Sequence, residues 1–172
     1  MESDYFGKIE EDWAGFSSEY SFSIPYFNRE VEVFLGSEYD DEGNETESLQ
    51  IQQLSDYERT LKSFLENIDD IIILIKEKAF EHYKKFYAHY YEKEFTVEGF
   101  FETDKNEGDI HSPLIIDTQD AHFEYMKNIE SMRVLDNNTI ILPIYYKLDR
   151  EHGLEILLRE NKVVNVSGIG EN

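Results

Sequence analysis

Residues 55–95 read SDYERTLKSFLENIDDIIILIKEKAFEHYKKFYAHYYEKEF, and this stretch decides the fold. Its apolar residues recur every three or four positions in one phase, which is the period of an α-helix and not the period of two that a strand shows. The stripe comprises Tyr57, Leu61, Phe64, Ile68, Ile72, Ile75, Ala79, Tyr83, Phe86 and Tyr90. The β-branched run Ile71-Ile72-Ile73 favours a strand locally, but the period on both sides outweighs that preference. We therefore predict one long helix that is covered on more than one side.

The sequence indicates where the expected helix begins and where it could break. Ser55-Asp56-Tyr57-Glu58 fits a capping box, in which the Ser55 hydroxyl accepts from the Glu58 amide and the Glu58 carboxylate reaches back. At about 1.5 Å per residue the helix would be roughly 60 Å long, so a break near Asn67 is allowed for.

Length and composition indicate a single folded domain. No Pro- or Gly-rich linker divides the 172 residues, so we expect residues 1–172 to form one domain. Aromatic residues make up 15% of the chain, which argues against disorder. The chain has no cysteine, which excludes disulfides and thiolate chemistry. The N-terminus lacks the pattern of a secretory signal, and no apolar run reaches the roughly 18 residues of a membrane span, so we expect a cytoplasmic protein.

Charge is the one extreme property of the composition. The 38 acidic and 16 basic residues give a net charge of −22. Such a surface repels nucleic-acid phosphates and anionic lipids, so we expect neither nucleic acid nor membrane as a partner. Such a surface keeps the protein soluble, matches a basic partner protein, or sequesters cations.

The residues before the helix contain strand patterns. Segment 4–16 mixes aromatic and acidic residues and is expected to be a short strand or an irregular segment. Apolar and polar residues alternate over 20–24, up to Pro25, and again over 30–35, which predicts two strands joined by a hairpin turn at 27–29. Segment 37–46 has no apolar period and is expected to be an exposed loop.

The residues after the helix change period. An extended segment over 95–116 should precede a second helix over 118–130, capped by Asp117 or Thr118. Its expected inward face consists of His122, Tyr125, Met126 and Ile129.

The C-terminal residues predict an antiparallel meander. Strands are expected over 132–136, 140–148, 154–158 and 163–166, with turns at Asn137-Asn138 and Glu160-Asn161. Packed on the long helix, they give an α+β fold with an N-terminal β-hairpin, one long central helix, a second shorter helix and a C-terminal antiparallel meander.

Motifs for common chemistry are missing. The chain contains no GxGxxG, GxxxxGK or GxSxG pattern. The acidic runs 40–42 and 104–109 do not match EF-hand spacing, and His82 and His89 lie two helical turns apart, too far for one metal ion. We therefore predict no catalytic residue, no metal ligand and no cofactor.

The most specific short element is Asp149-Arg150-Glu151-His152-Gly153-Leu154. It predicts a tight turn between strands, with Gly153 at positive φ and an acidic residue orienting the His152 ring. The turn is read in three ways: a structural turn, a partner contact, or an active or metal site. The last reading requires further polar groups, such as His111 or His122, to converge on it.

Four short motifs occur in order along the chain: Tyr5-Phe6-Gly7-Lys8, Ile24-Pro25-Tyr26-Phe27, the Gln-rich approach 50–53 with Tyr57 and Glu66-Asn67, and Asp149-x-Glu151-His152-Gly153-Leu154. Together they resemble an uncharacterised bacterial family that is known only as a domain of unknown function. The family usually carries an aromatic residue before that Asp, where this chain has Leu148. The resemblance implies no activity and no catalytic residues. Small acidic proteins of this sort are often immunity or accessory proteins of bacterial toxin systems.

Three functions remain in view. The leading hypothesis is a non-enzymatic, acidic, protein-binding module, of the kind an immunity-type inhibitor would be, that covers a basic partner. Its expected contact residues are Glu38, Asp40, Asp41, Glu42, Asp149, Glu151 and His152, together with the exposed acids of the long helix. The alternatives are a metal-assisted hydrolase that uses His152 with Asp149 or Glu151, and a structural or regulatory homodimer.

Overall fold

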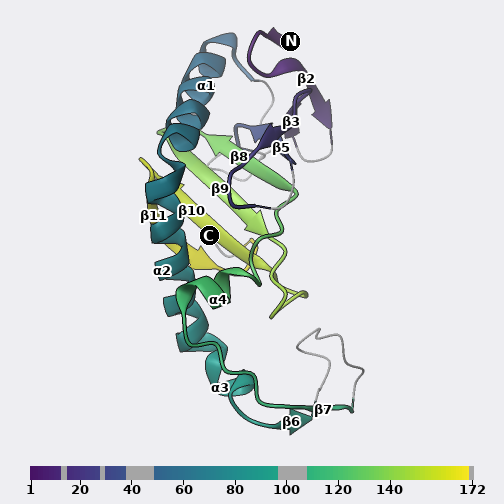
Figure 1. The fold of residues 1–172 in the computed structure, drawn as a ribbon. Helices are drawn as coiled ribbons and strands as arrows, with labels where there is room; N and C mark the ends of the chain where they lie inside the picture. Colours follow the sequence, from purple (N-terminus) through teal and green to yellow (C-terminus); the bar gives the residue numbers. More distant parts are fainter. Residues whose placement is uncertain (13–14, 28–29, 38–48, 97–107, 171–172) are drawn as a thin grey trace.

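The computed structural model describes residues 1–12, 15–27, 30–37, 49–96 and 108–170 (Figure 1). Helices run along one face of a long sheet, which confirms the α+β class. The main sheet consists of β1 (Glu2–Ser3), β2 (Gly7–Asp12), β3 (Gly15–Ser18), β4 (Phe22–Ser23), β5 (Glu30–Leu35), β8 (Ser131–Leu135), β9 (Thr139–Ile144), β10 (Leu154–Arg159) and β11 (Lys162–Ser167). The other elements are α1 (Ile51–Glu66), α2 (Ile68–Phe86), α3 (Ala88–Tyr91), α4 (Gln119–Phe123) and the strand pair β6 (Phe95–Thr96) and β7 (Ile110–His111).

One parallel pair of strands joins the two halves of the sheet. The strand order is β1-β2-β3-β5-β8-β9-β10-β11, with β4 pairing to β5. All of these pairs are antiparallel except β5 with β8, where Val33 lies opposite Met132. A parallel pair needs a long crossover, and the helices supply it here. The sequence predicted a separate hairpin and meander, so the continuous sheet is a correction.

The predicted long helix is three consecutive helices. The first begins at Ile51 rather than Ser55, and the Gln50 N–H donates 2.9 Å to the side-chain oxygen of Gln53. The capping box expected at Ser55 is wrong, because the Ser55 hydroxyl donates to the Gln52 carbonyl within the helix. The break near Asn67 is confirmed, and its side-chain amide donates 2.8 Å to the Ser63 carbonyl, which competes with the helical ladder.

A second break lies at Tyr87, and helical structure ends at Tyr91 rather than 95. The expected stripe stops near the same point. Its members from Tyr57 to Tyr83 are at most 6% exposed, whereas Phe86 and Tyr90 are 46% and 45% exposed. The stripe therefore leaves the core at the end of α2: Phe86 is the last residue of that helix, and Tyr90 lies in α3, beyond the break at Tyr87.

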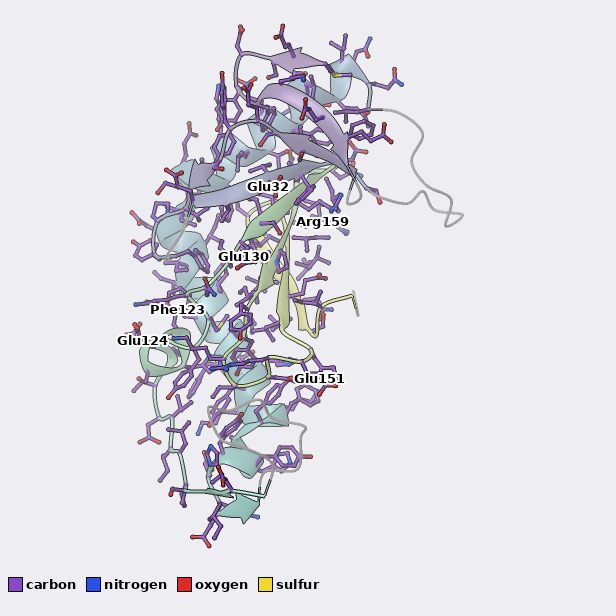
Figure 2. The ribbon with its side chains drawn as sticks, turned by 90° about the vertical axis from the view of Figure 1, so that its right-hand side faces the viewer. Glu32, Phe123, Glu124, Glu130, Glu151 and Arg159 are labelled. Carbon is purple, nitrogen blue, oxygen red and sulfur yellow. The ribbon has the colours of Figure 1, made fainter. Side chains whose placement is uncertain are left out.

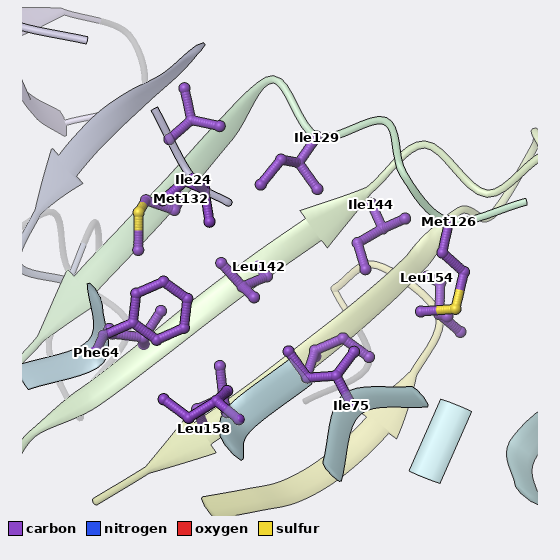
Figure 3. Packing of buried hydrophobic residues seen from close by; sticks show 14 of the residues in the cluster. Ile24, Phe64, Ile75, Met126, Ile129, Met132, Leu142, Ile144, Leu154 and Leu158 are labelled. Carbon is purple, nitrogen blue, oxygen red and sulfur yellow. The ribbon is translucent and has the colours of Figure 1, made fainter. Parts of the chain in front are cut away.

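The core fills the space between the helices and one face of the sheet. Phe64 and Ile75 lie over Leu142 and Leu158, as Figure 3 shows. Alternate residues of the central strands contribute to this face, and each is at most 2% exposed: Ile140, Leu142, Ile144, Leu154, Ile156 and Leu158. Their period of two is the one that the sequence predicted.

Both expected turns of the C-terminal meander are confirmed. Asn137 and Asn138 have φ of 57° and 52°, and Glu160 and Asn161 have φ of 49° and 60°. The pairing of Arg159 with Lys162 leaves a two-residue turn between β10 and β11, and the pairing of Leu135 with Thr139 leaves a three-residue connection between β8 and β9.

The second helix and the strand predicted over 140–148 are both shorter than predicted, for a shared reason. Thr118 caps α4 as expected, because its hydroxyl accepts 3.1 Å from the Ala121 amide. The chain beyond α4 then pairs with segment 145–147: the Tyr145 amide donates to the Asn128 carbonyl and the Lys147 amide to the Tyr125 carbonyl. This pairing ends the helix and takes 145–148 out of the sheet.

The N-terminal segment is more regular than expected. Segment 4–16 contributes β2 and the first half of its neighbour β3, while the strand predicted over 20–24 is reduced to β4. The predicted turn at 27–29 and the loop at 37–46 fall largely outside the described residues. In the described part of the chain, no helix combines the length and apolarity needed to cross a membrane.

Candidate functional site

The turn before β10 is built on a buried carboxylate. Asp149 is 3% exposed, and its Oδ2 accepts 2.9 Å from the Tyr87 hydroxyl. Its Oδ1 accepts 3.1 Å from the His152 amide, and the His152 Nδ1 lies 3.1 Å from both carboxylate oxygens. The Asp149 carbonyl accepts from the Gly153 amide. Asp149 therefore orients the His152 ring, as the sequence indicated, and also closes the turn.

Gly153 occupies the position that only glycine accepts without strain. Its φ is +65°, and a Cβ placed there would lie 2.5 Å from Cδ1 of Ile169 and 3.1 Å from the Ile144 carbonyl oxygen. The Ile169 amide donates 3.1 Å to the His152 carbonyl, so the segment after β11 packs on the turn. The structural role of the turn is thus supported by contacts from two other segments.

A cluster of aromatic side chains, called the aromatic layer below, extends from this turn. The Tyr87 ring packs edge-on against Tyr146, with 5.6 Å between centroids, and the Tyr146 hydroxyl lies 2.7 Å from Nε2 of His122. The Tyr91 hydroxyl donates to the Leu148 carbonyl, and its ring contacts His111 at 5.2 Å. This aromatic layer places three of the five histidines in one cluster.

The histidines of the aromatic layer do not converge on a point. His111 contacts the Tyr91 ring, His122 contacts the Tyr146 ring, and the His152 ring contacts the Asp149 carboxylate. Among the described residues no group of three His, Asp or Glu side chains could hold a metal ion.

Burial shifts the pKa values of several groups in and beside the aromatic layer. Desolvation lowers the pKa of His122 to about 4, with a smaller lowering contribution from His82. Burial likewise raises the pKa of Tyr83 to about 12 and that of Tyr146 well above its usual value. These three side chains are neutral at neutral pH, which fits packing better than proton transfer.

The predicted contact residues fall into three groups. Glu151 points away from the body of the protein (Figure 2) and the His152 side chain is 45% exposed, so both are accessible. Asp149 is buried beneath them. Glu38, Asp40, Asp41 and Glu42 lie outside the described residues.

A different surface combines exposed apolar and acidic side chains. Ile73 on α2 is 59% exposed, and Asp69, Asp70 and Glu77 stand three or four residues from it, on the same side of the helix. Lys76, one turn further on, lies against Asp120 of α4 at 2.7 Å. The sequence gives no sign that Ile73 is a surface residue, because Ile73 belongs to an apolar run that resembles core.

Tyr26 extends this surface from the loop between β4 and β5. Its hydroxyl donates 2.5 Å to Oδ1 of Asp69, which raises the pKa of Tyr26, and the residue is 46% exposed. Its φ is 76°, an unusual conformation for a large side chain. The acidic face is defined here as Tyr26, Glu66, Asp69, Asp70, Ile73 and Glu77.

Comparisons with protein-family models, with curated proteins and with solved structures find no match for this chain. The resemblance to the bacterial family stays a prediction.

Proposed function

We propose that this protein is a non-enzymatic protein-binding module that covers a basic partner protein with its acidic face, in the manner of an immunity-type inhibitor. The observation that carries the proposal is Ile73, which is 59% exposed on a helix whose neighbouring exposed positions are acidic. Interfaces concentrate their binding energy in a few apolar anchors, with polar residues around them excluding water. Ile73 fits the anchor, and Asp69, Asp70 and Glu77 fit the rim.

The charge of the chain supports the choice of partner. A net charge of −22 attracts a basic protein at long range and speeds its encounter with the acidic face. It also disfavours a homodimer through this face, because a two-fold interface centred on Ile73 would bring the carboxylates around Ile73 close to those of the other copy.

Tyr26 supports a function for the same surface. A non-glycine residue in the left-handed region costs about 1–2 kcal/mol, and such strain concentrates where binding needs a fixed geometry. Here the strained backbone holds an exposed phenol against Asp69 and so adds an amphipathic ring to the acidic face.

The hydrolase alternative gains less from the structure. Its proposed ligands are His152 with Asp149 or Glu151, but Asp149 already accepts hydrogen bonds from Tyr87 and from the His152 amide. Metal analysis of protein purified without chelators addresses this alternative. The hydrolase would be favoured if the wild-type protein contained stoichiometric zinc or manganese and the His152→Ala variant did not.

The binding proposal is tested by retention of lysate proteins on the immobilised chain at about 50 mM and 500 mM salt, where screening weakens contacts between exposed charges. We expect a basic protein to be retained at low salt and released at high salt. Retention should be lost in Ile73→Ser and in the double variant Asp69→Lys/Asp70→Lys. The control double variant Glu94→Lys/Asp117→Lys makes the same charge change at exposed positions elsewhere and should retain the protein.

Two results would contradict the binding proposal. If no basic protein is retained in a salt-sensitive way, the proposal fails. It also fails if the control variant loses the retained protein as completely as the Asp69→Lys/Asp70→Lys variant does, because net charge and not the acidic face would then explain binding.

A further inference from the structure

A second surface feature, a groove whose charge differs from that of the acidic face, lies on the flank of α2 beside β11. It has a volume of about 390 Å³, and its lining includes Lys78, His82, Lys85 and Phe86 from the helix and Val164 and Val166 from the strand. The helix packs alongside β11, which is the terminal strand of the described sheet (Figure 1). The groove therefore runs along an edge of the sheet.

The charge of the groove is opposite to that of the whole protein. Its charged lining consists of Lys78 and Lys85 against Glu81, and His82 adds a titratable group. Lys78 pairs with Glu81 at 2.8 Å. The Lys85 ammonium lies over the Phe86 ring, 4.6 Å from its centroid, and within the described ranges no carboxylate pairs with it. A locally cationic groove stands out on a chain with a net charge of −22.

The groove also exposes apolar side chains where the sequence pattern predicts burial. Phe86 belongs to the apolar stripe of the helical stretch, yet it is 46% exposed. Val164 on β11 is 51% exposed. The two side chains line one groove, so together they form an apolar floor beside the cationic groups.

We propose that this groove binds an extended acidic segment of a partner protein, laid along β11. In an extended chain, successive side chains point to opposite sides, so an alternating sequence places its apolar residues on one side and its acidic residues on the other. The apolar residues can then contact the apolar part of the groove while the acidic residues contact its cationic part. The apolar residues would cover Phe86 and Val164, and the carboxylates would approach Lys85 and Lys78. Extended peptides commonly bind by lying along the edge of a sheet.

This inference goes beyond the proposed function, because it concerns another surface and selects the opposite charge. A partner with an acidic segment would bind here whether or not the acidic face binds a basic protein. The two proposals therefore fail independently.

The experiment uses two fluorescein-labelled, N-acetylated ten-residue peptides, one alternating Val with Glu and the other alternating Val with Lys. Binding to the full-length protein is measured by fluorescence anisotropy at pH 7.5 and near-physiological salt. The net charge favours the Lys peptide everywhere except at the groove. We expect the Glu peptide to bind at least tenfold more tightly, which only a local cationic site can produce.

Two variants locate the binding, and a third serves as the control. Lys85→Glu and Phe86→Ala change exposed side chains and should each weaken binding of the Glu peptide at least fivefold. Lys93→Glu makes the same charge change at an exposed position beyond α3 and should leave it unchanged. The proposal is overturned if the Lys peptide binds more tightly, or if Lys85→Glu and Lys93→Glu give the same affinity for the Glu peptide.

Discussion

The Tyr87 hydroxyl donates a hydrogen bond of 2.9 Å to the buried carboxylate of Asp149, which lies 62 residues later in the chain. The bond connects the break between α2 and α3 to the turn before β10. Tyr91 makes a second connection through its hydroxyl to the Leu148 carbonyl. Two tyrosine hydroxyl groups therefore anchor the helix break at Tyr87 to the segment between β9 and β10.

The first prediction concerns this hydrogen bond. Tyr87→Phe should lower the free energy of unfolding by about 1–2 kcal/mol, because a bond to a charged acceptor is lost and the ring is kept. Asp149→Ala should cost more, since it leaves several donors without their acceptor. Urea unfolding measures both. A Tyr87→Phe protein as stable as the wild type would show that the bond contributes nothing.

A pH dependence follows from His122. Burial lowers the pKa of the folded imidazole to about 4, while the unfolded chain binds the proton near 6.5. The free energy of unfolding should therefore be highest above pH 6.5, fall between pH 6.5 and 4, and change no further from this group below pH 4. The full loss is roughly 3 kcal/mol, at about 1.4 kcal/mol per pKa unit.

Carboxylates also titrate in the lower part of that range, so the test compares wild type with His122→Leu. Between pH 6.5 and 4.5, the free energy of unfolding should fall more steeply for the wild type than for the variant. The difference in slope should approach about 1.4 kcal/mol per pH unit, which corresponds to one extra proton taken up on unfolding. Parallel stability curves from urea unfolding at each pH would contradict the assignment.

Gly153→Ala should destabilise the protein by about 1–3 kcal/mol, because an alanine at φ +65° is strained and its Cβ meets Ile169 and the Ile144 carbonyl. The double variant Gly153→Ala/Ile169→Ala removes one of the two close contacts. Relative to Ile169→Ala alone, the glycine substitution should then cost less in thermal unfolding. An equal cost in both backgrounds would assign the whole effect to the backbone conformation.

Glu160→Gly should stabilise the protein by about 1 kcal/mol. Glu160 has φ of 49° in the turn between β10 and β11, where glycine carries no penalty from a Cβ. Glu160→Gln is the matched control, because it removes the same charge and keeps the strain. If both variants gain equal stability in urea unfolding, the gain comes from charge and not from the backbone.

Local signals were sufficient for much of this fold. The helical period placed the core residues of α1 and α2, and the asparagine pair at 137–138 marked a turn between two alternating strands. The parallel pairing of β5 with β8 had no local signal, since it depends on how the helical crossover packs. The break at Tyr87 was missed for a similar reason, because a bond to Asp149 and not a proline or glycine accompanies it.

The same distinction between local signals and tertiary packing applies to the candidate sites. The Asp149–Leu154 turn was readable because its residue types have turn chemistry of their own. The acidic face and the groove were not readable, because the exposure of Ile73 and Phe86 depends on which side of α2 the sheet covers. An apolar residue within a helical stripe carries no mark that separates core from interface.

The pairing of β5 with β8 also affects how the chain is made. During synthesis the strands up to Leu35 leave the ribosome long before Ser131, so the side of β5 that later pairs with β8 has no partner. Unpaired strand edges invite association between nascent chains, and the acidic residues Glu30 and Glu32 on β5 discourage it through like-charge repulsion. Replacing both acids by Thr should leave the folded protein intact while increasing the fraction lost to aggregation during expression.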